Sequence, residues 1–136
     1  MKRSYTMLLV TFTTMLLAGC QTAHEPIEQR INIETYTTHA YEKTTNTTKA
    51  TEAIALLHNV DWQSARIGKA RPADYKIQFS NSLTDAKTPV YELWLSPRKD
   101  KIEIVVPATN QYAQLDRQTS KQLFKTIMQH DLASVQ

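Results

Sequence analysis

The chain has 136 residues, of which 41% are hydrophobic and 21% charged, and its formal net charge is +3 at pH 7. A chain of this length holds one hydrophobic core, since domains usually run to about 100–150 residues, and this composition excludes disordered and coiled-coil proteins. Gly19 and Gly68 are its only glycines, whereas loops that cradle phosphates need several. P-loop and Rossmann-type nucleotide-binding proteins are therefore excluded.

The first residues have the layout of a bacterial lipoprotein signal peptide. Lys2 and Arg3 precede an uncharged stretch of residues 5–17, and this stretch leads into Leu17-Ala18-Gly19-Cys20. A basic start, an apolar stretch and small residues before the cleavage point are typical of signal peptides. The stretch is also shorter than the roughly 20 residues that a membrane-crossing helix needs. Residues 1–19 are therefore predicted to be removed.

Cys20 is the predicted lipidation site. It is the only cysteine in the chain, so it can form no disulfide within the chain. The ending Leu-Ala-Gly-Cys resembles a lipobox, whose cysteine takes a diacylglyceryl group and becomes the new N-terminus. Two acyl chains give stable anchoring where one does not, so we expect an extracytoplasmic protein held on the cell membrane. The alternative is an ordinary secretory signal followed by a free thiol.

Cleavage also removes most of the excess positive charge. Without Lys2 and Arg3, 14 Lys and Arg remain against 13 Asp and Glu, a formal charge of +1. Binding to nucleic acid requires several clustered cations that displace counterions from phosphates. We therefore expect no nucleic-acid partner.

Residues 20–30 are predicted to be the lipidated N-terminus and a flexible tether, and residues 31–136 a single domain. Ile31 and Ile33 alternate with polar residues, which predicts a first strand. Residues 35–51 contain eight threonines, whose branched side chains favour extended backbone. This segment fits a strand, a hairpin or an exposed loop, and glycosylation or disorder is the competing interpretation.

Two amphipathic helices are predicted. In residues 48–59, apolar residues recur at helical spacing, at Ala50, Ala53, Ile54, Leu57 and Val60. Near the C-terminus, Thr119 and Gln122 fit a capping box. A second apolar stripe follows them, at Leu123, Phe124, Ile127 and Met128.

Period-2 alternation predicts strands at residues 75–79, 91–95 and 102–106, and a short one at 112–115. Residues 62–67 are a further candidate, followed by a turn at Gly68. Strands joined by short polar turns pair antiparallel. The predicted fold is therefore α+β, with a meander-like antiparallel sheet of four to five strands packed by two amphipathic helices.

Catalytic and metal-binding patterns are missing from the sequence. The four histidines, at positions 24, 39, 58 and 130, are too far apart for zinc-ligand spacing, and no serine lies between glycines as in a nucleophile elbow. We expect no metal, no cofactor and no catalytic residue. Paired carboxylates, either Asp61 with Asp74 or Glu92 with Glu103, are the alternative that an enzyme or enzyme inhibitor would use.

Aromatic residues are the candidate binding groups. Trp62, Tyr91 and Trp94 lie in or beside the predicted strands, and aromatic rings bind sugars or peptides by stacking. Trp94 lies on the side of its strand opposite to Leu93, so it either faces water or is covered, and packing is the alternative to ligand binding. The cationic run at residues 98–101 fits a hairpin turn or a contact with anionic headgroups or wall polymers.

Five short motifs follow one another along the chain: Trp62-Gln63-Ser64-Ala65-Arg66-Ile67, Arg71-Pro72-Ala73-Asp74-Tyr75, Tyr91-Glu92-Leu93-Trp94-Leu95, Tyr112-Ala113-Gln114-Leu115 and Ser120-Lys121-Gln122-Leu123-Phe124. In this order they resemble the YhfM-like lipoproteins of Bacillus and its relatives. The resemblance covers residues 48–130 and the lipobox. It implies a small lipid-anchored protein facing outward from the single membrane of a Gram-positive cell, and it assigns no catalytic residue. The threonine-rich segment departs from the family.

The leading functional hypothesis is a non-catalytic lipoprotein. Its domain would bind a cell-surface protein or a wall polymer, and the membrane itself would be a partner through the anchor on Cys20. The alternatives are an enzyme or enzyme inhibitor that uses carboxylates, and a structural spacer.

Overall fold

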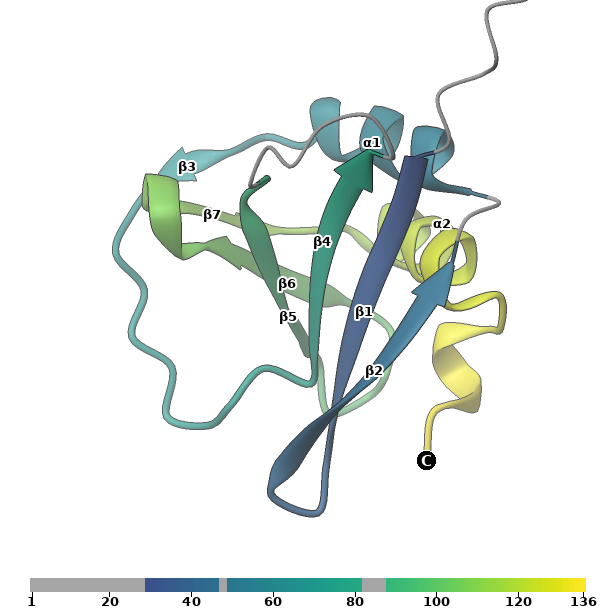
Figure 1. Cartoon of the computed structure of the whole chain (residues 1–136). Coiled ribbons are helices and arrows are strands. Elements are labelled where there is room, and N and C mark those ends of the chain that lie inside the picture. The colour runs from purple at the N-terminus through teal and green to yellow at the C-terminus, as the bar shows by residue number, and fades with distance from the viewer. Residues whose placement is uncertain (1–28, 47–48, 82–87) are drawn as a thin grey trace, which may run out of the picture.

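The structure is a computed structural model that describes residues 29–46, 49–81 and 88–136. The predicted signal peptide, Cys20 and residues 21–28 lie outside the described residues. Seven strands form one antiparallel sheet in the order β2-β1-β4-β5-β6-β7-β3, and helices α1 and α2 lie on the same side of it (Figure 1). The predicted α+β class is confirmed, and the sheet has more strands than the four to five expected.

Helix α1 follows β2 in the chain, and α2 follows β7. The strands are β1 (Gln29–Thr37), β2 (Ala40–Asn46), β3 (Gln63–Ser64), β4 (Tyr75–Asn81), β5 (Val90–Leu95), β6 (Ile102–Val106) and β7 (Gln111–Gln114). The helices are α1 (Ala50–His58) and α2 (Arg117–Met128), with 3₁₀ turns at Pro107–Thr109 and Leu132–Ser134. No helix in the described part of the chain has the length and apolar character needed to cross a membrane.

The threonine-rich segment forms the hairpin of β1 and β2. Thr37 pairs with Ala40 across a turn made by Thr38 and His39, which both have positive φ. Positive φ at both central residues gives a two-residue turn the twist that the flanking strands need. β1 starts at Gln29, two residues before the predicted domain start, because Gln29 already pairs with Asn81 of β4.

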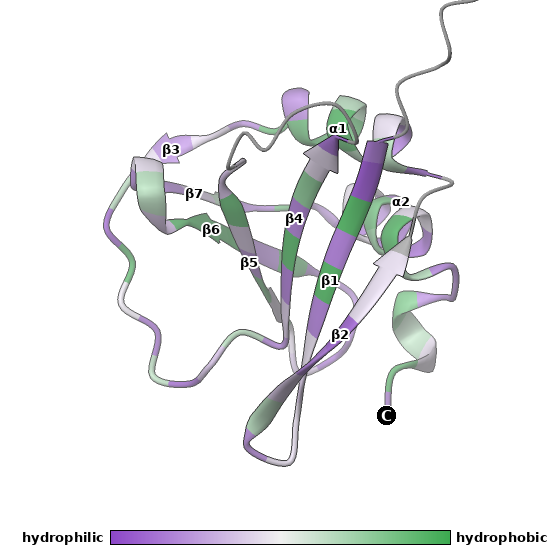
Figure 2. Ribbon diagram, viewed as in Figure 1, coloured by the Kyte–Doolittle hydropathy of each residue, from purple (hydrophilic) through white to green (hydrophobic). Residues whose placement is uncertain are grey.

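The hydrophobic core lies between the sheet and the two helices. Figure 2 shows hydrophobic and hydrophilic residues alternating along β1 and β4, as expected for strands with one buried face. Phe124 of α2 is fully buried, and its ring meets that of Tyr75 edge-on at 5.6 Å. The other large aliphatic side chains fully buried in this core are Ile31, Ile77, Leu93, Ile102, Ile104, Leu123, Ile127 and Leu132.

Helix α2 begins earlier than the predicted capping box. Its N-cap is Asp116, whose carboxylate accepts hydrogen bonds from the backbone N–H and the hydroxyl of Thr119, both at 2.8 Å. These bonds hold the pKa of Asp116 below its usual value. A carboxylate caps a helix as well as a hydroxyl does, so Thr119 lies inside the first turn rather than at its start.

The segment between Trp62 and Asp74 also differs from the expectation. Only β3 forms, because two residues, Gln63 and Ser64, pair with β7. Residues 65–73 then cross the face of the sheet opposite the helices (Figure 1). Gly68 has no positive φ, and a Cβ there would meet nothing within 4 Å, so the predicted turn at Gly68 was wrong.

The Ser120 hydroxyl joins α2 to the sheet. Ser120 is fully buried and accepts a hydrogen bond from the backbone N–H of Ile102, at 2.9 Å. We expect Ser120→Ala to lower the free energy of unfolding by about 1–3 kcal/mol, because the buried N–H of Ile102 then has no acceptor. Urea unfolding measures this, with Ser64→Ala at an exposed position as the control. Equal midpoints for the two variants would contradict the role of Ser120.

Candidate functional site

Two of the three predicted aromatic residues meet in one pocket. Trp62 lies just after α1 and Tyr91 lies on β5, and their ring centroids are 6.2 Å apart. Phe79 of β4 meets Tyr91 nearly edge-on, at 5.8 Å. With His58 and Gln111 these rings line a cavity of about 270 Å³ at the C-terminal end of α1. We call this cavity the aromatic pocket.

The end of α1 fixes the position of Trp62. The indole N–H of Trp62 donates to the carbonyl of Leu57, at 3.0 Å, and the Asn59 side chain donates to the carbonyl of Ala55. Both bonds go to carbonyls near the C-terminal end of the helix, where the last carbonyls have no partner in a regular helical turn. Since the indole N–H is occupied, Trp62 offers a ligand only its ring surface.

Polar groups stand beside the rings of the aromatic pocket. Among the described residues, the Tyr91 hydroxyl has no hydrogen-bond partner, and burial raises the pKa of its phenol, so it stays a neutral donor and acceptor. The amide oxygen of Gln111 accepts from Thr109, which leaves its NH₂ group free to donate. His58 is exposed at the rim. The pocket therefore combines ring surfaces with hydrogen-bonding groups.

Nothing in the sequence pattern indicated that Phe79 and Gln111 line this pocket. The alternation in β4 marked Phe79 as a core residue, and its ring does lie at the edge of the core. Gln111 lies beside the pocket because β7 pairs with β3. β3 has only two residues, which is too short for a periodic pattern in the sequence.

Trp94 lies on the opposite face of the sheet from the aromatic pocket. Its side chain is 7% exposed and packs with Ala73, Val105 and Tyr112. The indole N–H donates to the carbonyl of Arg71, at 3.1 Å. Segment 65–73 thus covers Trp94. The sequence alone had not decided whether this side chain faces water or is covered. The predicted three-residue surface is divided between two faces, and the ring of Trp94 is closed to ligands.

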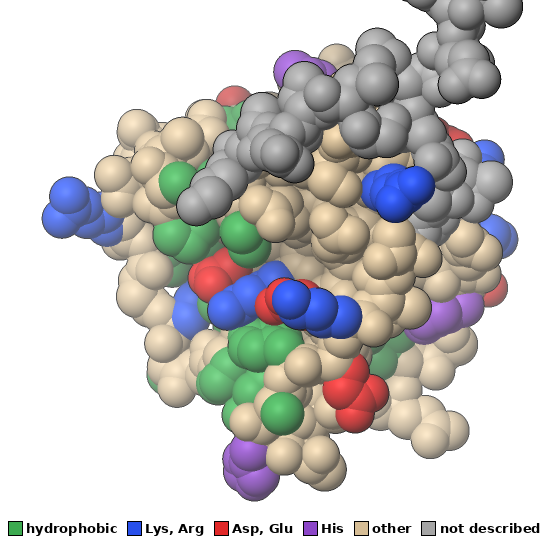
Figure 3. Space-filling view, viewed as in Figure 1, with side chains coloured by type: hydrophobic (Ala, Val, Ile, Leu, Met, Phe, Trp, Pro, Cys, Tyr) green, Lys and Arg blue, Asp and Glu red, His purple; other side chains and the backbone are tan. Residues whose placement is uncertain are grey.

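Three of the four carboxylates proposed as catalytic pairs have a cation as a partner, and Asp61 forms no ion pair within the described residues. On the face that carries Trp94, Glu92 lies 3.6 Å from Lys76, and Glu103 pairs with Lys69. Asp74 is held by Arg71 at 2.6 Å. Figure 3 shows acidic and basic side chains next to one another across the middle of this face. Glu92, Glu103 and Asp74 are therefore in three separate ion pairs.

The histidines lie on separate elements. His39 is in the hairpin turn, His58 ends α1 and His130 follows α2. His24 lies outside the described residues. No group of three His, Cys, Asp or Glu side chains that could hold a metal ion occurs in residues 29–46, 49–81 and 88–136.

Comparison with protein-family models, curated proteins and solved structures finds no match for this chain. The resemblance to YhfM-like lipoproteins therefore stays a prediction that depends on the quoted motifs.

The burial of Tyr91 has a measurable consequence at alkaline pH. Because folding raises the pKa of this phenol, its contribution to stability is complete below about 10, the value of an unfolded tyrosine, and is lost as the pH rises through the folded value. We expect the tyrosinate absorbance difference between the wild type and Tyr91→Phe to titrate above the usual value. In urea the same difference should titrate normally, and identical curves in both conditions would contradict the burial of Tyr91.

Proposed function

We propose that this chain is a lipoprotein, anchored on the outer side of the cell membrane through Cys20, whose domain binds a ligand at the cell surface. The observation that carries the proposal is the ending Leu17-Ala18-Gly19-Cys20 after a basic start and an apolar stretch. The chain's single cysteine stands at the position that such a signal reserves for lipid.

The anchor would keep the domain near the bilayer. Eight residues, 21–28, separate Cys20 from Gln29, where β1 begins. A chain of eight residues spans at most about 28 Å when fully extended. The ligand would therefore be a component of the envelope within a short distance of the membrane surface.

The aromatic pocket supports binding as the activity of the domain. Trp62 and Phe79 supply ring surfaces, and the Tyr91 hydroxyl and Gln111 amide supply hydrogen bonds. Sites for drug-sized ligands enclose about 300–1,000 Å³, and this cavity, at about 270 Å³, lies just below that range. It suits a single sugar ring or a single peptide side chain, which a wall component or a surface protein would present.

Lipidation of Cys20 can be tested directly. The full-length wild-type chain, expressed in a Gram-positive host, should incorporate an acyl label, and Cys20→Ser should incorporate none because the thiol is the acceptor. Mass spectrometry of the N-terminal peptide should find the acyl groups on Cys20. Thr22→Ser, which leaves the cysteine in place, is the control. An unmodified Cys20 thiol in the membrane fraction would contradict the proposal.

Ligand binding in the aromatic pocket can be followed by tryptophan fluorescence, because one of the chain's two tryptophans lines the pocket and the other does not. Trp94→Phe leaves Trp62 as the only indole, whereas Trp62→Phe leaves only Trp94, on the opposite face. Titration with soluble wall fragments should change the fluorescence of Trp94→Phe saturably, because Trp62 lines the pocket. The fluorescence of Trp62→Phe should stay constant.

Circular dichroism checks that both single-tryptophan variants are folded. An equal response of both indoles, or none in the Trp94→Phe variant, would show that the aromatic pocket does not bind these fragments.

A further inference from the structure

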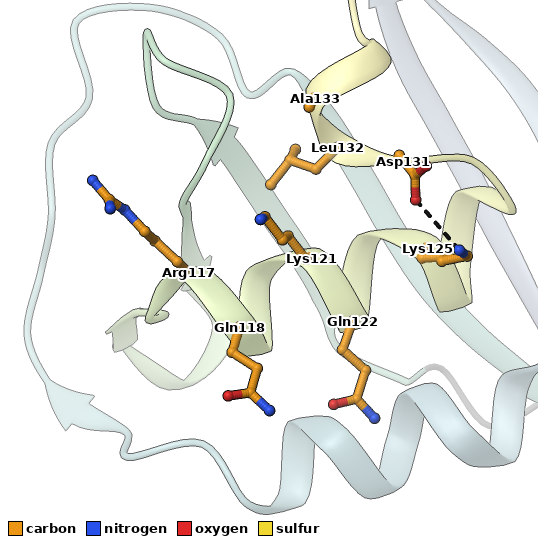
Figure 4. A pocket seen from close by; sticks show the side chains of 8 residues that line it. All are labelled: Arg117, Gln118, Lys121, Gln122, Lys125, Asp131, Leu132 and Ala133. Atoms are coloured by element: carbon orange, nitrogen blue, oxygen red, sulfur yellow. Dashed lines mark ion pairs between the residues drawn. The ribbon is translucent and has the colours of Figure 1, made fainter.

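A second hollow, separate from the aromatic pocket, lies between α2 and the 3₁₀ turn Leu132–Ser134. It has a volume of about 770 Å³. Arg117, Lys121 and Lys125 border it, and because they are four residues apart they lie along one face of α2. Figure 4 shows Arg117 and Lys121 on the side of the helix that faces Leu132, with the Gln118 side chain directed to the other side.

The three cations of this hollow differ in their partners. Nε of Arg117 lies 2.9 Å from Oδ2 of Asp100, and Nζ of Lys125 lies 3.4 Å from Oδ1 of Asp131. Lys121, between them, is exposed and has no ion pair within the described residues. Its ammonium group is therefore available to an anion from outside the chain.

The turn between β5 and β6 extends this positive surface. The ion pair of Arg117 with Asp100 brings the first turn of α2 beside this hairpin turn, which has the cations expected from the sequence. Asp100 stays ionised, because the Ser96 hydroxyl, followed by Arg117, lowers its pKa. We name the whole set the α2 basic surface: Arg98, Lys99, Lys101, Arg117, Lys121 and Lys125.

The excess positive charge of the described residues is confined to the α2 basic surface. Its six cations are accompanied by three acids, Asp100, Asp116 and Asp131. In the remaining described residues, Asp and Glu equal Lys and Arg in number. A surface that carries the whole surplus of one sign attracts a ligand of the opposite sign and raises its rate of association.

The orientation of the sheet distinguishes two kinds of anionic ligand. β1 starts at Gln29, which pairs with the last residue of β4, and β5 then runs back from Val90 to the turn that bears Arg98. A six-residue strand covers about 20 Å, so this turn lies at the end of the sheet away from Gln29. In a domain anchored through residue 20, the turn is therefore at the end farther from the anchored start of β1, which favours contact with soluble polymers over the headgroups around the anchor.

We propose that the α2 basic surface binds a phosphodiester polyanion. One phosphate of the polyanion would lie at Lys121, and the adjacent phosphates would lie at the cations of the β5–β6 turn. The hollow beside Lys121 gives a flexible chain room that a flat bilayer would not fill. The choice of a soluble polymer over headgroups depends on the proposed anchor at Cys20, whereas the charge argument does not.

The test is the affinity of the detergent-solubilised full-length lipoprotein for a fluorescent glycerol phosphate oligomer. Lys121→Gln should weaken binding about two- to fivefold, the range for one exposed ion contact, and should make the dependence of affinity on salt shallower. Lys121→Arg should keep the affinity. Lys43→Gln removes the same charge from an exposed side chain of β2 and should have no effect.

Amine footprinting then separates the two sources of phosphate. With the lipoprotein in phosphatidylcholine vesicles, the oligomer should protect Lys121 from acylation and leave Lys43 reactive. Replacing part of the lipid with phosphatidylglycerol, without oligomer, should give no protection.

Three results would overturn the proposal: no binding of the oligomer, equal weakening by Lys121→Gln and Lys43→Gln, or protection of Lys121 by phosphatidylglycerol alone. The affinity measurement in detergent does not use the membrane. A failure there is therefore distinct from a failure of Cys20 to carry lipid.

Discussion

Burial of one face of the sheet beneath two helices is the constraint on which the rest of the structure depends. Phe124 and Ile127 of α2 lie against strands whose alternate side chains all enter the same core. A shift of one residue in β1, β4, β5 or β6 would move its apolar side chains to the opposite face, so burial sets the register of the pairs that these four strands form with one another. The register in turn decides which side chains reach the other face, and Trp94 lies there because Leu93 and Leu95 lie in the core.

The aromatic pocket forms where this cover ends. α1 has only nine residues, and within the described residues no helix follows it over the ends of β4 and β5 that carry Phe79 and Tyr91. The chain turns at Asn59, and the hydrogen bond from Trp62 to Leu57 holds the indole beside the rings of Phe79 and Tyr91. The pocket is thus a corner of the core that the short helix leaves unfilled.

The parts of the fold that carry a clear period could be predicted from the sequence. β4, β5, β6 and the two helices each repeat their apolar residues at 2 or near 3.6 positions, and the side of the strand on which Trp94 lies followed directly. The cover over Trp94 could not be predicted, because residues 65–73 have no period. Contacts distant in sequence set their path, among them the bond from the Asp74 N–H to the Leu93 carbonyl.

Composition also left the β1–β2 hairpin among several alternatives. Threonine is compatible with strands and with exposed loops, and the sequence does not show that Ile33 pairs with both Thr44 and Ile77. The contact between the rings of Trp62 and Tyr91 could not be predicted from the local sequence either. It requires α1 to end at a particular residue and the sheet to place β5 beside that end, which are both properties of the assembled core.

Charge on this domain separates into two arrangements with different physical consequences. On the face that carries Trp94, Lys76 lies 4.4 Å from the ring centroid of Tyr41 and pairs with Glu92. Lys69 likewise pairs with Glu103 and lies 5.3 Å from the ring of Trp94.

Such cations are held by both an acid and an aromatic ring, so an external anion would have to displace a carboxylate to reach them. Lys121 has no such acid within the described residues, and an incoming phosphate there displaces only water and counterions. The difference between Lys69 or Lys76 and Lys121 is therefore the presence of a carboxylate partner, and not the number of cations on the same face.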